Sequence, residues 1–108
     1  MLYQAITPTK LGQAAIGIAT STLYTVPAST RTFLKDIDIA NTTATTITIT
    51  VYIGAGATTA NALLYQIPVR GNSTLQWAGN QILNAADTIQ VVASATGCTI
   101  SASGGEAV

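Results

Sequence analysis

Residues 45–53 read Thr-Thr-Ile-Thr-Ile-Thr-Val-Tyr-Ile, and this stretch decides the fold class. Its aliphatic residues recur at every second position, with threonine or tyrosine between them. Side chains of a β-strand alternate between two faces, so one face of this segment is apolar and the other carries hydroxyl groups. The pattern predicts a strand that is buried on one face and exposed on the other.

The same period of two residues continues in the segments on either side. In residues 32–41 it predicts that Phe33 and Ile37 share one face, while Leu34 lies on the other. In residues 62–70 it aligns Tyr65 with the apolar residues of that segment. Residues 81–86 are expected to form a loop with room for one helical turn. Further strands are predicted at residues 74–78, 87–96 and 98–103, and with less regular spacing at 3–7, 13–19 and 23–26.

The number of predicted strands sets the architecture. About seven or eight short strands with turn signals between them are typical of a β-sandwich or a small barrel. We predict an all-β antiparallel sandwich; both a jelly roll and an immunoglobulin-like order fit, and the jelly roll is preferred. Residues 12–103 are expected to form this domain, residues 1–11 an N-terminal arm or edge strand, and residues 104–108 a flexible tail.

Composition excludes several kinds of active site. The chain has 108 residues, no histidine, one cysteine and only 7% charged residues, with zero net charge. Without histidine there is no imidazole base and no histidine metal site, and one cysteine cannot build a zinc cluster. Four basic residues are too few to neutralise a nucleic-acid backbone. We therefore predict a non-enzymatic protein with no cofactor, no metal and no nucleic-acid partner.

Hydropathy gives no indication of a membrane partner. The most apolar early stretch, residues 14–26, is interrupted by serine and threonine. It falls short of the roughly 20 apolar residues that a membrane-spanning helix needs. No membrane association is expected.

The distribution of charge predicts association with other protein surfaces. No charged residue lies between Asp38 and Arg70, or between Asp87 and Glu106. Natural sheets usually protect their edges with charges, prolines or bulges, and here hydroxyl groups and one proline take that place. We expect copies of the chain or another protein to cover much of the surface, and a trimer is the favoured assembly of copies.

Three local features are candidates for a catalytic or binding site. Asp36 and Asp38 are the only paired carboxylates, roughly 6.6 Å apart along one strand face. That spacing suits a glycosidase pair or a Ca²⁺ ligand pair, but a solvated strand face is the preferred interpretation. Cys98 is in phase with Ile100 and is expected to be a small core residue. The sequence Gly54-Ala55-Gly56 lacks the following Lys-Ser/Thr of a phosphate loop, so a hairpin turn is expected.

Aromatic residues supply the candidate interface positions. Trp77 is expected in the core. Tyr52 lies on the threonine-rich face of its strand, where it could contact another protein, be incidentally exposed, or stack on a sugar ring. Leu2 and Tyr3 belong to the predicted arm and complete the candidate interface set.

Turn and core positions in residues 22–28, 37–43, 61–65 and 82–89 carry a resemblance that covers about Leu23 to Ser103. These segments resemble small virion proteins of tailed bacteriophages. Proteins of this kind are β-sandwich subunits of the particle, and they bring no catalytic residues to transfer. The resemblance implies a capsid decoration (cement) protein that oligomerises and bridges subunits of the major capsid protein. It also implies a virion location after synthesis in the host cytoplasm.

The resemblance leaves other functions open. A tail, neck or fibre component of the virion is the main alternative. A carbohydrate-binding module that uses Tyr52 or Trp77 as a platform is a third function, from a different class.

Overall fold

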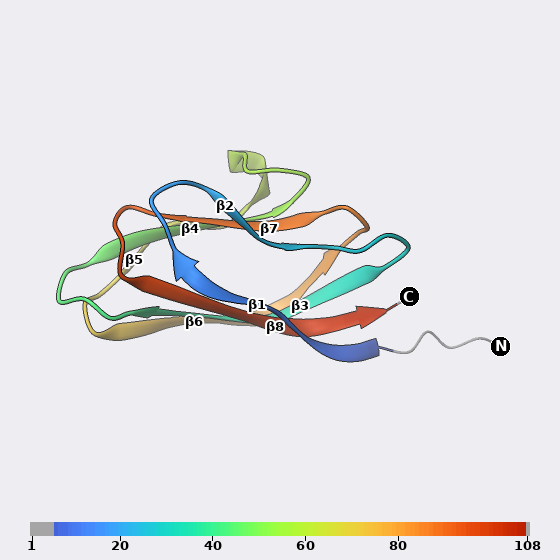
Figure 1. Ribbon diagram of the computed structural model, residues 1–108, viewed down its shortest axis with the longest axis horizontal. Helices are drawn as coiled ribbons and strands as arrows, with labels where there is room; N and C mark the ends of the chain where they lie inside the picture. The colour runs from blue at the N-terminus through green and yellow to red at the C-terminus, as the bar shows by residue number, and fades with distance from the viewer. Residues whose placement is uncertain (1–5, 108) are drawn as a thin grey trace.

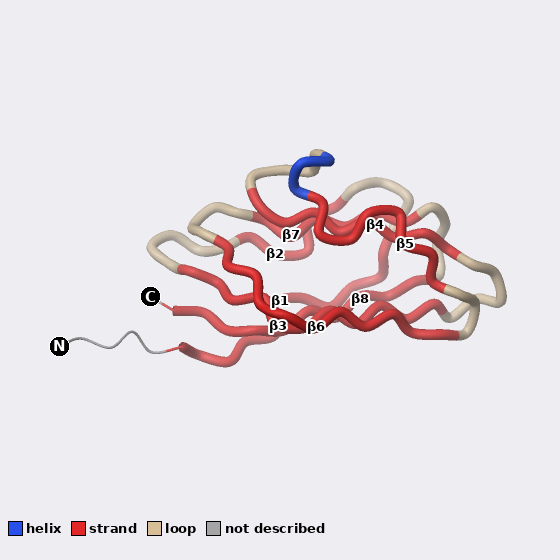
Figure 2. Tube along the Cα trace, turned by 180° about the vertical axis from the view of Figure 1, so that it is seen from behind, coloured by secondary structure: helices blue, strands red, loops and turns tan. Residues whose placement is uncertain are grey.

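The computed structural model describes residues 6–107, and their strands form two stacked antiparallel sheets (Figure 1). Short loops join the strands at both ends of the sandwich (Figure 2). The elements in chain order are β1 (Ile6–Ile16), β2 (Ser21–Thr25), β3 (Arg31–Asn41), β4 (Ile47–Gly54), a 3₁₀ turn η1 (Thr59–Asn61), β5 (Ala62–Val69), β6 (Ser73–Leu83), β7 (Thr88–Ala93) and β8 (Cys98–Ala107). The all-β sandwich predicted from the sequence is confirmed.

The strand order is that of a jelly roll. One sheet, sheet A, has the order β1-β8-β3-β6, and the other, sheet B, has the order β2-β7-β4-β5. Each strand of the first half pairs antiparallel with its counterpart from the second half: β1 with β8, β2 with β7, β3 with β6, and β4 with β5. The chain is therefore one long two-stranded ribbon, turned back at the β4–β5 hairpin and folded into two layers.

The core lies between the two sheets. The alternation predicted for residues 45–53 is confirmed in β4, because Ile47, Ile49 and Val51 are buried. Burying large aliphatic side chains contributes about 1.5–3 kcal/mol each. The other fully buried large side chains are Ile16, Leu34, Ile37, Ile39, Leu83, Ile89, Val91 and Ile100.

A β-bulge in β3 corrects the predicted faces of that strand. Leu34 is opposite Gly104 and Asp36 is opposite Ser103, so Lys35 is an extra residue without a partner. An extra residue reverses the alternation of side chains beyond it. Leu34 is consequently buried, and Phe33, which the period of two placed with Ile37, lies half-buried on the outer face.

A second bulge corrects the prediction for β5. Ile67 is opposite Ile49 and Leu64 is opposite Val51, so two residues face the single Thr50 between them. Gln66 adopts a left-handed φ of 49°, and its N–H donates to the Thr50 hydroxyl at 3.0 Å. The bulge turns Tyr65 outward, where it is 49% exposed instead of sharing the buried face with Ile67.

Two strands extend further than the sequence predicted. β6 continues to Leu83 through residues assigned to a loop, and β8 continues to Ala107 through residues 104–107, for which a flexible tail was expected. Both strands pair with the eleven-residue β3, which supplies hydrogen-bonding partners along its whole length. Backbone pairing does not require side chains, so the glycines of this segment join the sheet. Residue 108 lies outside the described residues.

Candidate interaction surfaces

The predicted interface residues fall in different places. Leu2 and Tyr3 lie outside the described residues, so their role stays a prediction. Tyr52 lies half-buried on the outer face of sheet B, opposite Gln90 of β7. Trp77 is also half-buried and packs against the core, in agreement with the core position predicted for it.

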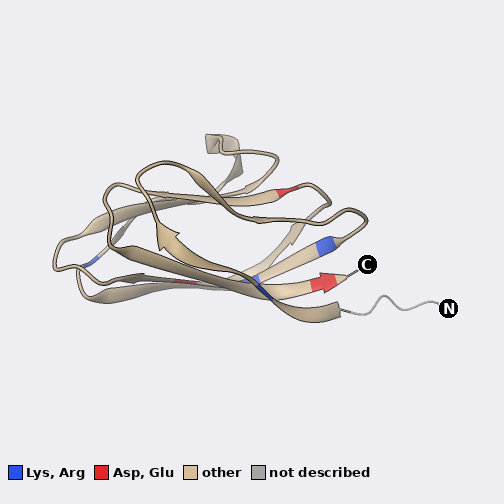
Figure 3. Cartoon of the chain, in the orientation of Figure 1, with Lys and Arg blue, Asp and Glu red and all other residues tan. Residues whose placement is uncertain are grey.

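The outer face of sheet B is free of charge. None of the four strands β2, β4, β5 and β7 contains an aspartate, glutamate, lysine or arginine. The charged residues lie on sheet A or in loops (Figure 3). The outer face of sheet B carries mainly hydroxyl and amide groups, from Thr22, Thr25, Thr48, Thr88 and Gln90, around Tyr52. We call this surface the neutral face.

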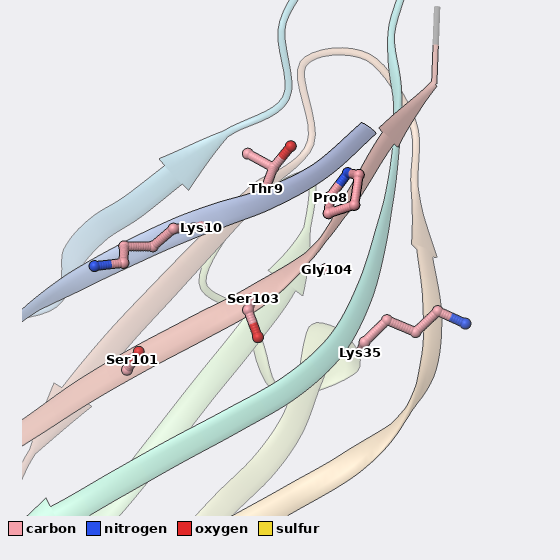
Figure 4. A pocket seen from close by; sticks show the side chains of 7 residues that line it. All are labelled: Pro8, Thr9, Lys10, Lys35, Ser101, Ser103 and Gly104. Carbon is pink, nitrogen blue, oxygen red and sulfur yellow. The ribbon is translucent and has the colours of Figure 1, made fainter. Parts of the chain in front are cut away.

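The outer face of sheet A carries a shallow hollow of about 460 Å³ over β8. Its floor is formed by Ser101, Ser103 and Gly104, whose small side chains lower the surface between β1 and β3. Lys10 and Lys35 stand on its two sides, and their amino groups point away from the floor (Figure 4). The hollow therefore gathers no positive charge over its floor.

An apolar row crosses sheet A at one end of this hollow. Ile82 is opposite Phe33, Phe33 is opposite Gly105, and Gly105 is opposite Pro8. Ile82 is 56% exposed, and Ile6 beside the row is 58% exposed. Sheet A thus offers a mixed surface, with charges along its middle and an apolar end.

Asp36 and Asp38 lie on the outer face of sheet A, on the same face of β3 as predicted. The hydrogen bond with Asp36 raises the pKa of the Asp38 carboxyl above its ordinary value, with smaller contributions from desolvation and from the charge of Asp36. Gln76 Nε2 donates to Asp36 Oδ1 at 3.3 Å. Within residues 6–107 no group of three or more metal-ligating side chains gathers here or elsewhere.

The remaining candidates are structural. Cys98 is 1% exposed in the core, as predicted, and burial raises the pKa of its thiol. Gly54 ends β4 with a φ of 121° and leads into a turn toward η1. The left-handed φ suits glycine, so the Gly54-Ala55-Gly56 segment serves chain reversal.

A polar contact between the sheets was missed by the sequence analysis. The Tyr24 hydroxyl of β2 lies 2.8 Å from the Thr32 hydroxyl of β3 and donates to the carboxylate of Glu106 in β8. Burial, followed by the hydrogen bond to Glu106, raises the pKa of Tyr24 to about 12. The contact joins sheet B to two strands of sheet A. Tyr24 and Glu106 lie far apart in the sequence, so no local pattern could reveal it.

The Tyr24 contact predicts a loss of stability at alkaline pH. Folding raises the pKa of Tyr24 from 10.0 to about 12, so the neutral phenol favours the folded state; this contribution is complete below pH 10 and is lost as pH rises toward 12. We expect Tyr24→Phe to lower the free energy of unfolding by about 1–2 kcal/mol at pH 7. The free energy of unfolding of the variant should also decrease less steeply between pH 10 and 12 than that of the wild type.

Urea unfolding of both proteins across this pH range measures the two effects together. The other tyrosines are common to both proteins, so their titration cancels in the difference. Parallel pH profiles for the two proteins would contradict the role given to Tyr24.

Comparisons with known proteins identify similar folds. No family model and no curated protein sequence matches this chain. A protein of the infectious bursal disease virus particle is similar in structure, with 10% identity, a TM-score of 0.58, and coverage of 96% of this chain and 30% of that chain. The chain therefore spans about a third of the length of that viral protein.

Two further structures match over most of both chains. One is from the disulfide-linked pili of Bacillus endospore appendages, with 15% identity, a TM-score of 0.54, and coverage of 98% of this chain and 90% of that chain. The other is from the acid-stable capsid of Helicobacter pylori bacteriophage KHP30, with 12% identity, a TM-score of 0.50, and coverage of 98% and 86%. None of the helical residues among those described forms a segment of membrane-spanning length and hydropathy. At these identities the similarity shows that the chain has a jelly-roll fold shared with proteins of viral capsids and bacterial appendages.

Proposed function

We propose that this chain is a non-enzymatic structural protein of a virus particle, a capsid decoration (cement) protein that stabilises the head by bridging capsid subunits. The observation that carries the proposal is the neutral face on one layer of the jelly roll. A protein that works by covering joints needs a broad surface that can be dehydrated at low cost. The neutral face has that property, because it contains no charge to desolvate.

The chemistry of the neutral face suits a large protein interface. Interface cores are depleted of charged residues and enriched in aromatic ones, and hydroxyl groups supply the hydrogen bonds that such contacts need. Tyr52 lies among these hydroxyl groups. A protein that binds only the assembled shell stabilises it by mass action, since each bound copy favours the assembled state.

The fold comparisons support the same function. The KHP30 capsid structure matches this chain over 86% of its own chain, so a jelly roll of this size occurs in a phage capsid. The proposal includes location in the virion, synthesis in the host cytoplasm, contact with the major capsid protein, and association with copies of itself. The trimer expected from the sequence belongs to the proposal. Light scattering of the purified protein measures its mass in solution and hence the number of chains in the oligomer.

A component of a fibre, tail or neck is the second candidate. The endospore pilus structure favours it, because a jelly roll of nearly the same length builds a filament there. The two candidates differ in how many copies each particle holds.

Copy number in purified particles distinguishes these functions. Quantitative mass spectrometry should give a number of copies in fixed, lattice-like proportion to the major capsid protein. A few copies per particle would assign the chain to the neck, tail or fibres instead. Its absence from particles would overturn a virion role altogether.

Matched lysine variants test the neutral face in a second experiment, in which purified protein rebinds to particles depleted of it. Tyr52→Lys places a charge on the neutral face, and Thr99→Lys places one on the exposed outer face of sheet A. Burying an unpaired charge is costly, so rebinding of Tyr52→Lys to depleted particles should weaken at least about tenfold. Thr99→Lys should bind like the wild type. Equal weakening of both variants would contradict the choice of surface.

A further inference from the structure

Strand β6 forms an open border of sheet A. It pairs with β3 on one side only, and its eleven residues extend over roughly 36 Å. Within residues 6–107, no hydrogen bond to another segment occupies the backbone groups on its outer side. Every second residue of β6 therefore presents an unpaired N–H and C=O away from the sheet.

The other three edge strands carry features that discourage pairing. β1 contains Pro8 and Lys10, β5 contains Pro68 and the bulge at Gln66, and β2 has only five residues with a bulge of its own. β6 contains no proline and no charged residue. Two of its residues, Gly79 and Asn80, face the single Lys35 of β3, but the even-numbered residues of β6 stay exposed along the whole strand. A long, uncharged edge that keeps its alternation is a template for another strand.

We propose that β6 pairs antiparallel with β6 of a second copy, about a twofold axis that passes through Ala78. The two copies of sheet A then form one continuous eight-stranded sheet with the same outer face on both sides of the axis. This contact does not depend on a virion role, and it joins copies in twofold pairs, separately from the threefold contact that a trimer would need.

The length of the strand favours an axis at Ala78. With the axis there, all residues from Ser73 to Leu83 find a partner. An axis at Gln76 would pair only residues 73–79, and one at Asn80 only residues 77–83. Since each added pair contributes hydrogen bonds and cross-strand contacts, the central register is the most stable.

The side chains of β6 complement one another in this register. Gln76 and Asn80 both lie exposed on the outer face, and each would face the other's amide across the axis. On the inner face, Trp77 would lie opposite Gly79 of the second copy. A Cβ built on Gly79 would lie 2.9 Å from Cζ2 of Trp77, so the indole already covers its own chain's glycine. The facing glycine adds no side chain to compete for that space.

Electrostatics do not oppose the contact. The charges nearest the interface belong to β3, one strand behind β6: the Asp36 and Asp38 carboxylates, and the oppositely charged Lys35, which lines a hollow together with Asn80. Three strand spacings separate the two copies of β3, which is roughly 14 Å. This exceeds the Debye length of about 8 Å at physiological salt, so repulsion between the two pairs is screened.

A cysteine at the axis tests the register directly. Residues opposite each other in an antiparallel pair have Cβ atoms about 4.5–5.5 Å apart, within reach of a disulfide after small adjustments. Ala78→Cys should therefore form a disulfide between two copies under mild oxidation. Thr74→Cys is the matched control: it is exposed on the same face, but its two copies would lie roughly 26 Å apart. Cys98 is buried and shared by both variants, and the wild type measures its background.

We expect Ala78→Cys to dimerise on non-reducing gels at least about tenfold faster than Thr74→Cys. Ala78→Lys should raise the dissociation constant of the pair about fivefold in analytical ultracentrifugation, because like charges would face each other at the axis. Circular dichroism verifies that each variant is folded. Equal cross-linking rates for the two cysteine variants would overturn the proposal. Cross-linking by Ala78→Cys in a protein absent from particles would retain it while rejecting the virion role.

Discussion

Replacing Asn41 by alanine should lower the free energy of unfolding by about 3 kcal/mol. Asn41 ends β3 and is 2% exposed. Its Nδ2 donates to the carbonyl oxygens of Thr45 at 2.7 Å and Val69 at 2.9 Å. Its Oδ1 accepts from the N–H of Thr43 at 3.0 Å and from the hydroxyl of the same residue at 2.7 Å. One side chain thus fastens the β3–β4 loop to the end of β5.

The large effect follows from what alanine leaves behind. The Val69 carbonyl lies in a buried contact, and without the amide it loses a hydrogen bond that water cannot readily replace. Asn41→Asp keeps the shape and the acceptor but removes both donors, so it should destabilise at least as much at pH 7. Asn84→Ala, at an exposed residue, should change stability by less than about 0.5 kcal/mol. Urea unfolding of the three variants measures these differences, and an Asn41→Ala protein as stable as Asn84→Ala would contradict the assignment.

Replacing Gly104 by alanine should also destabilise the fold by about 3 kcal/mol, the upper end for an added methyl group in a packed site. A Cβ on Gly104 would overlap the carbonyl oxygen of Phe33, and it would lie 3.3 Å from the Cα of Leu34. Both atoms belong to the backbone of β3 at its bulge. A backbone neighbour cannot rotate away as a side chain can, so β8 would have to separate from β3.

Gly56 provides the matched control for Gly104. A Cβ on Gly56 would meet nothing within 4 Å. Gly56→Ala should therefore leave stability within about 0.5 kcal/mol of the wild type. Thermal and urea unfolding compare the two variants, and equal stabilities would show that β8 has room beside the bulge.

The period of two in the sequence was sufficient to predict the class of fold. It identified β3 and β4, the burial of Ile37 and Ile49, and the inward position of Cys98. These are local consequences of alternation along a single strand. The sequence also indicated part of the neutral face, because the long stretch without charged residues contains β4 and β5.

The bulges could not be predicted in the same way. The extra residue in β3 is defined by its pairing with β8, and the one in β5 by its pairing with β4. Each reverses the alternation, so Leu34 and Leu64 replace Phe33 and Tyr65 on the inner face. Pairing between distant strands also explains why the glycine-rich segment after Ser103 forms a strand. Its composition resembles that of a tail, and its neighbours on both sides determine its structure.

The ribbon arrangement has a consequence for how the protein is made. The β4–β5 hairpin can form early, because its strands are close in the sequence, but Ile6 must find Ala107 before β1 has its partner. Sheet A also has β8 between β1 and β3, so its assembly waits until residues 98–107 have left the ribosome. Such non-local pairing slows folding to about milliseconds to seconds. During that interval the apolar faces of both layers stay open to neighbouring nascent chains, so a short interval protects the protein from aggregation.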